Sequence, residues 1–356
     1  MLKQRILFDF LRGKLYLGQI LNIFKYVFGR RKIIVNWRPI YLTIFVTYKC
    51  NLHCDMCLTH SRRHENIFGQ KPCKDMDFET FKRILNVYKN ALVVTLTGNG
   101  EPLMNDDFFK MVEFASKEMK MYVYSATNGT LIGKHKENIV DSYLSLISIS
   151  VNGHNVLEFS RLTGLSPEYF DLIVKNTKEL VELRNKKRNT KLKIWATIIL
   201  DNKNYFFLTE MINFASFLGV DCILFLPFLA SPKEGFRAEE RCLFSDDVNV
   251  LDKFKEAGVM MKRLKMKVIL PPLLDREKLK YPNKFKRCKV PFYNLTVDGE
   301  GNIGGCSCQL LDNSKNGKFY DSDAWNNSYF RDLRGRFLIS GAPVLEPCVW
   351  CYRRGK

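Results

Sequence analysis

The stretch that decides the fold, residues 47–58, reads Thr47-Tyr48-Lys49-Cys50-Asn51-Leu52-His53-Cys54-Asp55-Met56-Cys57-Leu58 and holds three cysteines in the spacing C-x3-C-x2-C. A run of β-branched and aromatic residues over 40–46 comes directly before it and predicts a buried strand. The cysteines therefore lie in the loop at the carboxyl end of that strand. Three thiolates so close together favour an iron–sulfur cluster that lacks a fourth protein ligand, with zinc-binding or buried cysteines as the alternative.

The composition predicts a folded chain with a large core. Of the 356 residues, 46% are hydrophobic and 13% are aromatic, which excludes an intrinsically disordered protein. No apolar run reaches the length of about 18 residues that a membrane-spanning helix needs. We expect three parts: a basic amphipathic extension over 1–36, a core domain over 37–275 and a small cysteine-bearing domain over 276–356.

The cysteines indicate metal binding in a reducing compartment. Eleven are present, and most of them fall into groups near the two ends of the chain. Asp9 and Arg12 interrupt the apolar run at the start, so no signal peptide is expected. We therefore expect a cytoplasmic chain whose cysteines bind metal rather than form disulfides.

The net charge of +19 is compatible with nucleic acid, an anionic membrane surface or an acidic substrate as partner. The basic residues are spread out, as in 184–188 and 262–267, and no nucleic-acid-binding motif accompanies them. A solvated basic surface is the simpler interpretation, and no specific nucleic acid is expected.

Residues 1–32 carry eight Lys or Arg and one acid, with apolar residues at helical spacing over 6–11 and 20–28. Two interpretations remain open. Such a helix can lie on an anionic membrane surface, or it can pack its apolar stripe against the main domain.

From residue 40 onward, apolar β-rich runs alternate with helical patterns, which predicts a parallel sheet, either open or curved into a barrel. In such sheets the active site lies at the carboxyl ends of the strands. The expected strands cover 40–47, 91–97, 120–127, 144–151, 192–200 and 220–228, and a short one covers 267–270. The expected helices lie near 77–89, 106–118, 134–143, 167–184, 204–218 and 246–264.

Small polar residues follow three of the expected strands, on the same rim as the cysteines. Gly98-Asn99-Gly100-Glu101-Pro102 suits a tight turn in which Glu101 can accept hydrogen bonds from an ammonium group, with an ordinary turn as the alternative. The next two strands end in Thr127-Asn128-Gly129 and in Ser150-Val151-Asn152.

Residues 40–230 resemble a radical S-adenosylmethionine (radical SAM) enzyme. The turn at 98–102 is similar to the GGEP motif of that family, although Asn99 replaces the second glycine and Asn152 stands where aspartate is common. The resemblance rests on the C-x3-C-x2-C loop with Met56 before its last cysteine, on Gly98–Pro102, on Thr127–Gly129, on Ser150 and on Arg161.

The resemblance implies a partial (β/α)6 barrel of the TIM type. It also implies a 4Fe–4S cluster on Cys50, Cys54 and Cys57, whose open iron binds SAM. An electron donor such as flavodoxin or ferredoxin would reduce the cluster, and a 5′-deoxyadenosyl radical would remove hydrogen from a substrate carbon. The residues that the resemblance assigns to SAM are Met56, Gly98, Asn99, Gly100, Glu101, Asn128, Ser150 and Arg161.

A second group of cysteines lies in the carboxy-terminal segment. Residues 294–304 carry strand–turn–strand signals with Asp298-Gly299 at the turn. The pair Cys348-Val349-Trp350-Cys351 has the C-x2-C spacing that commonly binds a metal, in a closed iron–sulfur cluster or in a zinc site.

This segment resembles the SPASM domain, or its shortened twitch form, which follows the radical SAM domain in a large subfamily. The matching features are Arg287-Cys288, the hairpin that ends at Cys306, Ala324-Trp325, Arg331 and the C-x2-C pair. The resemblance implies one auxiliary 4Fe–4S cluster, with Cys288, Cys306, Cys348 and Cys351 as ligands and Cys308 left over.

Two of the remaining thiols bear on the chemistry. Cys242 follows the sixth expected strand, and it or Cys308 could donate a hydrogen atom to a substrate radical. Cys222 lies inside a strand pattern and is expected to be buried.

The auxiliary cluster favours an oxidation in which the substrate radical gives up an electron, as in the dehydrogenation of a sugar or cyclitol alcohol. Redox-neutral epimerisation and the maturation of a ribosomally made peptide are the alternatives. The substrate is thus a small molecule or a peptide. A metal- or RNA-binding protein without catalysis would leave the motifs at the strand ends unexplained.

Overall fold

The computed structural model describes residues 15–62, 75–228, 238–281, 288–307, 316–339, 341–343, 345, 348 and 351. The strands of this part of the chain are β1 Tyr41–Thr47, β2 Val93–Gly98, β3 Tyr122–Thr127, β4 Leu146–Ser150, β5 Lys193–Leu200, β6 Cys222–Pro227, β7 Lys267–Ile269, β8 Asn294–Val297 and β9 Ile303–Gly304. Within the described residues they form one nine-stranded sheet in the order β7-β6-β5-β4-β3-β2-β1-β8-β9.

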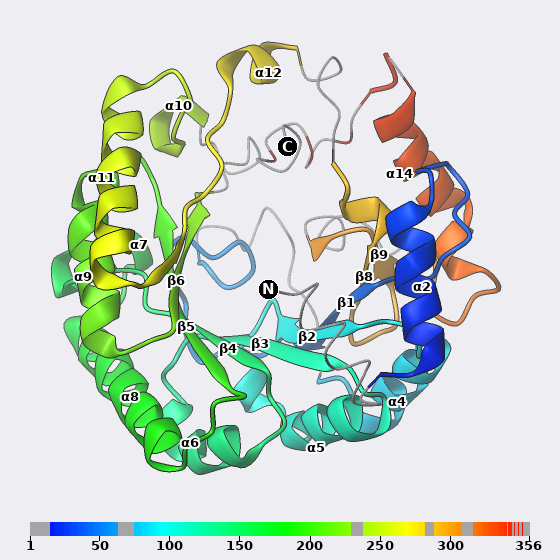
Figure 1. Cartoon of the computed structure of the whole chain (residues 1–356), viewed down its shortest axis with the longest axis horizontal. Coiled ribbons are helices and arrows are strands. Elements are labelled where there is room, and N and C mark those ends of the chain that lie inside the picture. The colour runs from blue at the N-terminus through cyan, green and yellow to red at the C-terminus, as the bar shows by residue number, and fades with distance from the viewer. Residues whose placement is uncertain are drawn as a thin grey trace.

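Helices surround this sheet in an incomplete ring, which leaves the strands on the inside (Figure 1). The long helices are α2 Leu17–Phe28, α4 Phe78–Val87, α6 Ile132–Asp141, α7 Val156–Thr163, α8 Pro167–Lys186, α9 Leu208–Leu218, α11 Val248–Leu264 and α14 Ser328–Leu338. The shorter ones are η1 Pro102–Met104, α5 Phe108–Glu113, the π-turn η2 Phe114–Glu118, η3 Tyr205–Phe207, α10 Ala238–Arg241, α12 Arg276–Lys280, η5 Val290–Phe292 and η7 Ala324–Asn326.

The predicted α/β fold is confirmed. Strands β1 to β7 pair in parallel, neighbour by neighbour. Five of the six long strands fall inside the ranges expected from the sequence, and β2 ends at Gly98, one residue beyond the expected 91–97. The sheet is not closed, because its order runs from β7 at one edge to β9 at the other. The architecture is therefore a partial barrel, and its carboxyl ends form one rim.

The interior strand β1 shows why this sequence builds such a sheet. Leu42, Ile44 and Val46 are fully buried and join the main hydrophobic cluster between the sheet and the helices. Phe45 points the other way and packs edge-on against Tyr48, with ring centroids 6.1 Å apart. A strand buried on both faces needs the continuous apolar run that the sequence supplies.

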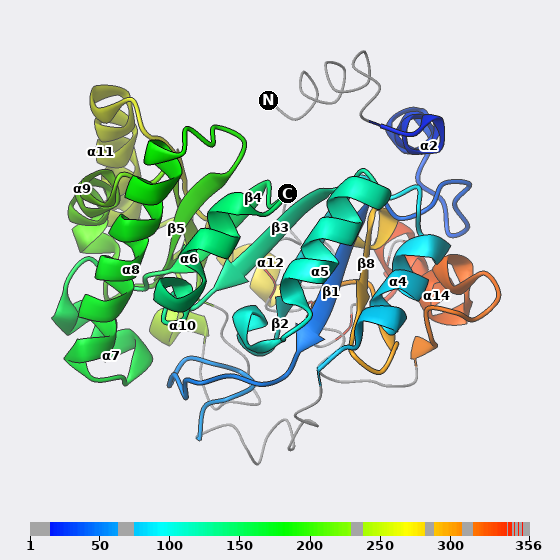
Figure 2. The ribbon, with the colours of Figure 1, turned by 90° about the horizontal axis from the view of Figure 1, so that it is seen from below.

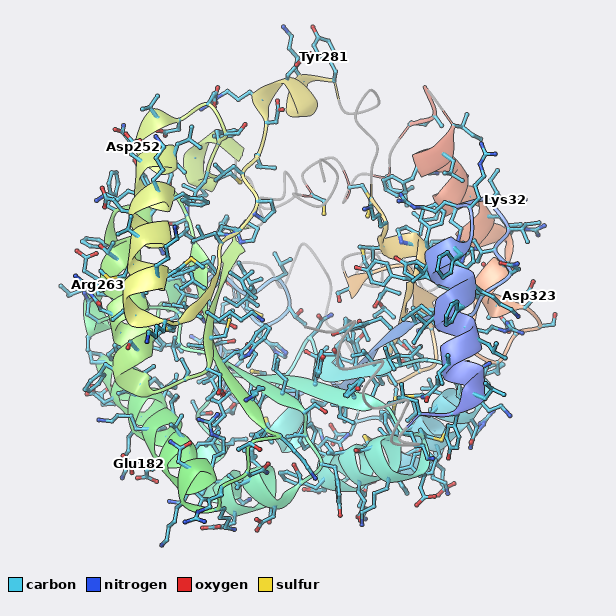
Figure 3. The ribbon with its side chains drawn as sticks, in the orientation of Figure 1. Lys32, Glu182, Asp252, Arg263, Tyr281 and Asp323 are labelled. Carbon is cyan, nitrogen blue, oxygen red and sulfur yellow. The ribbon has the colours of Figure 1, made fainter. Side chains whose placement is uncertain are left out.

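Many charged side chains of the outer helices face solvent. Glu182 of α8 and Asp252 and Arg263 of α11 point away from the ring into solvent (Figure 3). Within the described residues, no helix combines the length and the apolar character that crossing a membrane requires.

The predicted hairpin at 294–304 is confirmed and continues the main sheet. Strand β8 pairs in parallel with β1, from Tyr41 opposite Asn294 to Ile44 opposite Val297. Strand β9 then returns antiparallel to β8. The indole Nε1 of Trp37 donates to the Phe292 carbonyl at 2.7 Å, just before β8. The segment after residue 288 is thus joined directly to the strand that leads into the first cysteines.

Candidate active site

The three cysteines of residues 47–58 lie in the loop after β1, as predicted. Cys50, Cys54 and Cys57 are all half-buried. The amide of Cys57 donates to the Cys54 carbonyl at 2.9 Å, and the amide of His60 donates to the Cys57 Sγ at 3.3 Å. The loop thus folds back on itself and brings the last two thiols onto one turn.

The three thiols affect one another electrostatically. Burial raises the pKa of Cys54 to about 12, and the charges of Cys57 and Cys50 add to this effect. Burial likewise raises the pKa of Cys50 to about 11, with further contributions from Glu101 and Cys57. Thiolates that repel one another in a half-buried loop are stabilised by cations placed between them.

Three thiols from one loop fit the cysteine ligands of an iron–sulfur cluster. Among the described residues, no group of three or more His, Cys, Asp or Glu side chains is arranged to hold a metal ion.

Two glycines allow the end of β2 to lie directly on the cysteine loop. A Cβ on Gly98 would overlap the Thr47 carbonyl, and one on Gly100 would overlap the carbonyl of Lys49. The amide of Glu101 then donates to that Lys49 carbonyl at 2.7 Å. The turn after β2 therefore fixes the backbone directly before Cys50.

The carboxylate of Glu101 joins this turn to the end of β3. Its Oε1 accepts from the Thr127 hydroxyl at 2.7 Å and from the Leu103 amide at 3.3 Å, while Oε2 accepts from the Asn128 amide at 2.6 Å. Glu101 is only 2% exposed, and burial raises its pKa against the effect of these donors. The contact between Glu101 and the SAM ammonium stays a prediction.

Asn128 extends the same connection to the first cysteine. Its Nδ2 lies 3.9 Å from the Cys50 Sγ and donates to the Asn51 Oδ1 at 2.9 Å. Its own Oδ1 accepts from the hydroxyl and the amide of Thr130. Cys50, Glu101 and Asn128, predicted from three separate motifs, are therefore in one contiguous group.

Helix α7, which was not predicted from the sequence, contacts the middle of the cysteine loop. The amide of Asp55 donates to the Thr163 carbonyl at 2.7 Å, at the last residue of that helix. The next residue, Gly164, has φ +69°, and a Cβ there would lie 2.6 Å from the Asp55 carboxyl carbon. The sequence does contain signals for both ends of this helix. Asn155 caps its start by accepting from the Glu158 amide, and a glycine follows its last residue.

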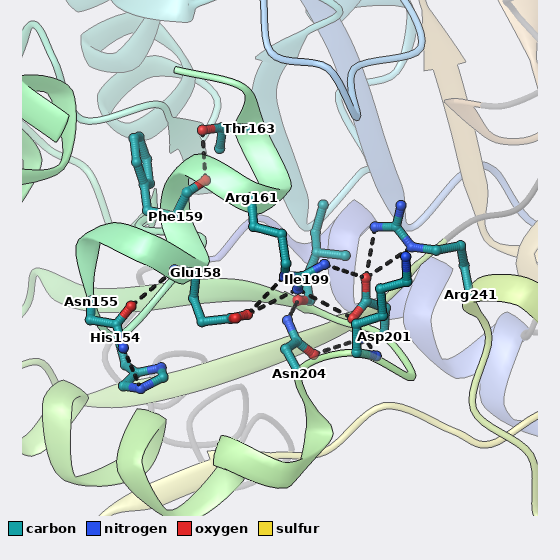
Figure 4. Close-up of polar contacts among 11 residues, drawn as sticks. His154, Asn155, Glu158, Phe159, Arg161, Thr163, Ile199, Asp201, Asn204 and Arg241 are labelled. Carbon is teal, nitrogen blue, oxygen red and sulfur yellow. Dashed lines mark hydrogen bonds and ion pairs between the residues drawn. The ribbon is translucent and has the colours of Figure 1, made fainter. Parts of the chain in front are cut away.

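Arg161 of α7 belongs to a polar network around a fully buried carboxylate, Asp201 (Figure 4). Arg241 donates to the Asp201 Oδ2 from Nε at 3.0 Å and from Nη2 at 2.7 Å. Arg161 contacts the same carboxylate at 3.4 Å and Glu158 at 2.9 Å. Burial alone would lower the pKa of Arg161. The carboxylates of Glu158 and Asp201 outweigh this effect, so the pKa of Arg161 is raised. Sequence motifs gave no sign of Asp201 or Arg241.

Other predicted SAM residues lie on the same rim. Ser150 is the last residue of β4, opposite Thr197 of β5. Asn99 has a buried Nδ2 without a hydrogen-bond partner, and such a donor is costly unless a ligand supplies an acceptor. This orphaned donor fits a bound polar ligand, although the assignment of these residues to SAM stays a prediction.

Cys242, which follows β6 and belongs to neither cysteine group, lies in a cluster that packs against the cysteine loop. Cys242 is 6% exposed and forms a small apolar cluster with Phe228 and Phe244, against which Met56 packs. Its role as a hydrogen donor stays a prediction. Cys222 is fully buried, as expected. Cys308, the second donor candidate, lies outside the described residues.

The predicted auxiliary ligands are half-buried, and the structure links some of them. The hydroxyl of Tyr329 accepts from the Gly305 amide at 3.1 Å. Burial raises the pKa of Tyr329, and the charges of Cys306 and Cys348 raise it further, so both thiols lie near this ring. Cys351 donates its amide to the Cys348 carbonyl at 3.3 Å, and Cys288 packs on the main core as Cys348 does. Four such thiols suit a closed cluster.

Comparison with known proteins finds a family likeness in the central part of the chain. The family model of the radical SAM superfamily matches residues 44–199. This range begins within β1, includes the three cysteines of the loop and reaches the end of β5.

Three relatives illustrate the similarity. The tungsten-containing aldehyde ferredoxin oxidoreductase cofactor-modifying protein of Pyrococcus furiosus is 26% identical over 52% of this chain and 50% of its own length. The mycofactocin maturase MftC of Mycolicibacterium smegmatis is 30% identical over 40% of this chain and 34% of its own length. The chain thus spans half of the first relative and about a third of the second.

The solved structure of Streptococcus suis SuiB bound to the precursor peptide SuiA covers 89% of this chain and 70% of its own, with a TM-score of 0.63. The sequence identity is 18%, so this likeness shows the fold alone.

The close approach at Gly100 gives a test of the site. We expect Gly100→Ala to displace the cysteine loop, because the new methyl overlaps the Lys49 carbonyl. The free energy of unfolding in urea should fall by about 2 kcal/mol or more, and about half of the bound iron should be lost. Gly258→Ala in α11 is the control: its methyl meets no atom within 4 Å, so stability should hold or rise by about 1 kcal/mol. Equal iron content in the two variants would contradict the view that the turn after β2 fixes the cysteine loop.

Proposed function

Because residues 44–199 belong to the radical SAM superfamily, we propose that the chain is an enzyme that removes a hydrogen atom from a C–H bond of its substrate. Enzymes of this family use a 4Fe–4S cluster together with SAM, and the SPASM-type relatives also carry auxiliary clusters. The observation that carries the proposal is the loop after β1, which holds Cys50, Cys54 and Cys57. Asn128 lies beside the Cys50 sulfur, and the amide of Glu101 donates to the carbonyl that precedes Cys50. When bound, the cluster and SAM together supply a 5′-deoxyadenosyl radical.

In this proposal the protein binds the cluster and orients SAM beside it. The three thiols bind the cluster, while the unpartnered amide of Asn99 after β2, the side chain of Ser150 at the end of β4 and that of Arg161 on α7 face SAM. Arg161 is suited to a carboxylate because Asp201 and Glu158 fix its guanidinium, which keeps 27% of its side-chain surface exposed. Fixing these groups before the reaction lowers the entropic cost of reaching the reactive geometry.

We propose an oxidation as the net reaction. An alcohol carbon that has lost a hydrogen atom must lose one more electron and one proton to become a carbonyl. An auxiliary cluster on Cys288, Cys306, Cys348 and Cys351 would supply the electron acceptor. In the division that we propose, these ligands belong to the part over 276–356, whose hairpin continues the sheet of the core part over 37–275. A sugar- or cyclitol-type alcohol is the first candidate substrate.

A peptide is the second candidate substrate. The relative MftC is named as a maturase, and the fold is shared with SuiB bound to its precursor peptide. Redox-neutral epimerisation is a further possibility in which the buried thiol of Cys242 would return a hydrogen atom. We propose that the chain works in the reducing cytoplasm and receives electrons from flavodoxin or ferredoxin.

The first test concerns SAM cleavage. With reductant and SAM under anaerobic conditions, the reconstituted chain should form 5′-deoxyadenosine, measured by liquid chromatography. Cys54→Ala should reduce this rate by about 100-fold or more, because it removes one of three cluster ligands. The matched control is Cys222→Ala, which removes a thiol that is buried in β6 and should retain the activity. Undiminished cleavage by Cys54→Ala would overturn the assignment of the loop.

The second test counts irons. The reconstituted chain should hold about eight irons, and Cys348→Ala/Cys351→Ala should hold about four while still forming 5′-deoxyadenosine. The absorbance of the cluster and the metal content, measured by mass spectrometry, check both numbers. Zinc in place of iron at these cysteines would remove the auxiliary cluster from the proposal.

The third test separates oxidation from epimerisation once a substrate is found. In deuterium oxide, oxidation should give a product lighter than the substrate by H2 and without deuterium at the reacting carbon. Epimerisation should give a product of substrate composition with deuterium from the exchangeable thiol at that carbon. Mass spectrometry distinguishes the two outcomes, and solvent deuterium at the carbon would exclude the dehydrogenase proposal.

A further inference from the structure

Helix α2 docks on the barrel through polar side chains. Gln19 is fully buried, and its Nε2 donates to the carbonyls of Ala91 at 2.9 Å and Met119 at 3.1 Å. Asn22 is 4% exposed and donates from Nδ2 to the Asn90 carbonyl at 3.1 Å. These acceptors directly precede β2 and β3, so the helix lies across the amino-terminal ends of the strands.

The apolar stripe of α2 consequently faces outward. Leu17, Leu21, Phe24 and Phe28 follow one another at intervals of four, three and four residues, which places them on one side of the helix. They are 67%, 52%, 57% and 77% exposed. The packing interpretation holds for Ile20 and Ile23, which pack against the cluster that contains Leu92 and Tyr122, but not for the four outward-facing residues. A continuous row of exposed large apolar side chains marks an interaction surface.

The segment of sequence that contains the stripe carries basic charge only. From residue 10 to residue 54 the chain contains no Asp or Glu. Lys25, Arg30, Arg31 and Lys32 are exposed within the helix or just after it, and Figure 3 shows Lys32 pointing outward at the end of α2. The surface that meets this stripe must therefore accept a dense positive charge.

A basic hollow lies at the same end of the barrel. It is lined by Leu15 near the start of α2 and by residues that precede β3, β4 and β5. Asp141 lines it too, but its carboxylate is paired with Lys187 at 2.8 Å. The basic residues of the hollow are Lys120, Lys187, Arg188 and Lys191.

We propose that this end of the barrel binds an anionic membrane surface, with α2 flat in the interface. Leu17, Leu21, Phe24 and Phe28 enter the headgroup region, and the flanking Lys and Arg meet the lipid phosphates. Charge decides against a second copy of the chain as the occupant, because two such stripes would bring like charges together.

The orientation follows from the fold. Helix α2 and the cysteine loop lie at opposite ends of the strands (Figure 2). A chain that rests on a bilayer through α2 therefore holds its candidate active site on the side away from the lipid, where it receives substrate from the aqueous phase.

The test is co-sedimentation of the full chain with vesicles of phosphatidylglycerol and phosphatidylcholine. The chain should bind them, should not bind pure phosphatidylcholine, and should be released at about 1 M salt, where the Debye length falls to about 3 Å. Leu21→Ser/Phe24→Ser should weaken binding by about 30-fold or more. Arg30→Gln/Arg31→Gln/Lys32→Gln should weaken it by about 100-fold.

The matched control is Phe217→Ser/Val259→Ser, which removes two equally exposed apolar side chains, 63% and 69%, from α9 and α11 and should bind as the parent does. Failure of the parent to sediment with anionic vesicles would overturn the proposal. So would equal weakening by the control, or light scattering that shows a dimer which Leu21→Ser/Phe24→Ser converts to a monomer. Formation of 5′-deoxyadenosine is independent of all these outcomes.

Discussion

A single buried carboxylate connects the strand ends that build the candidate site. Glu101 accepts from the end of β3 through Thr127 and Asn128, while its own amide donates to the Lys49 carbonyl after β1. Hydrogen bonds to an ionised group contribute about 1.5–3 kcal/mol each, and a buried carboxylate without them would be strongly unfavourable. The charge of Glu101 therefore stabilises the site only while three neighbouring strands stay in register. This makes the rim cooperative: the turn after β2, the end of β3 and the backbone before Cys50 are held as one unit.

The cysteine loop is fixed from two sides, and both contacts depend on the absence of a side chain. Gly100 brings the turn after β2 onto Lys49, and Gly164 brings the end of α7 onto Asp55. Between these clamps, Cys54 carries the repulsion of both other thiolates. A loop free to spread would relax that repulsion by separating its sulfurs. Because the backbone is clamped, cations bound between the thiolates would relieve the repulsion instead, and cluster binding would then depend on the packing of the whole rim.

The sequence predicted what local patterns determine and missed what the tertiary fold determines. The runs of β-branched residues predicted β1 to β6, and the cysteine spacing predicted the loop, because both signals are contained in a few consecutive residues. The network of Asp201 with Arg161 and Arg241 was not predictable, since its members lie 40 residues apart on either side and follow no periodic pattern. The amphipathic pattern of α2 likewise predicted a stripe but not its direction. That direction depends on Gln19, whose carbonyl partners come from distant turns.

The orientation of α2 bears on the candidate site because β1 lies between them. The residues that Asn22 holds, at the Arg38 and Pro39 carbonyls, lead directly into β1, and the same strand ends at the loop of Cys50. Strand β1 lies inside the sheet and pairs with β2 on one side and β8 on the other. Because β1 is rigid, an attachment at its amino-terminal end fixes the position of the cysteine loop at its carboxyl end. The attachment itself takes no part in the chemistry of the thiols. In our proposals, the exposed stripe at one end of β1 sets where the chain resides, and the cysteine loop at the other end carries the chemistry.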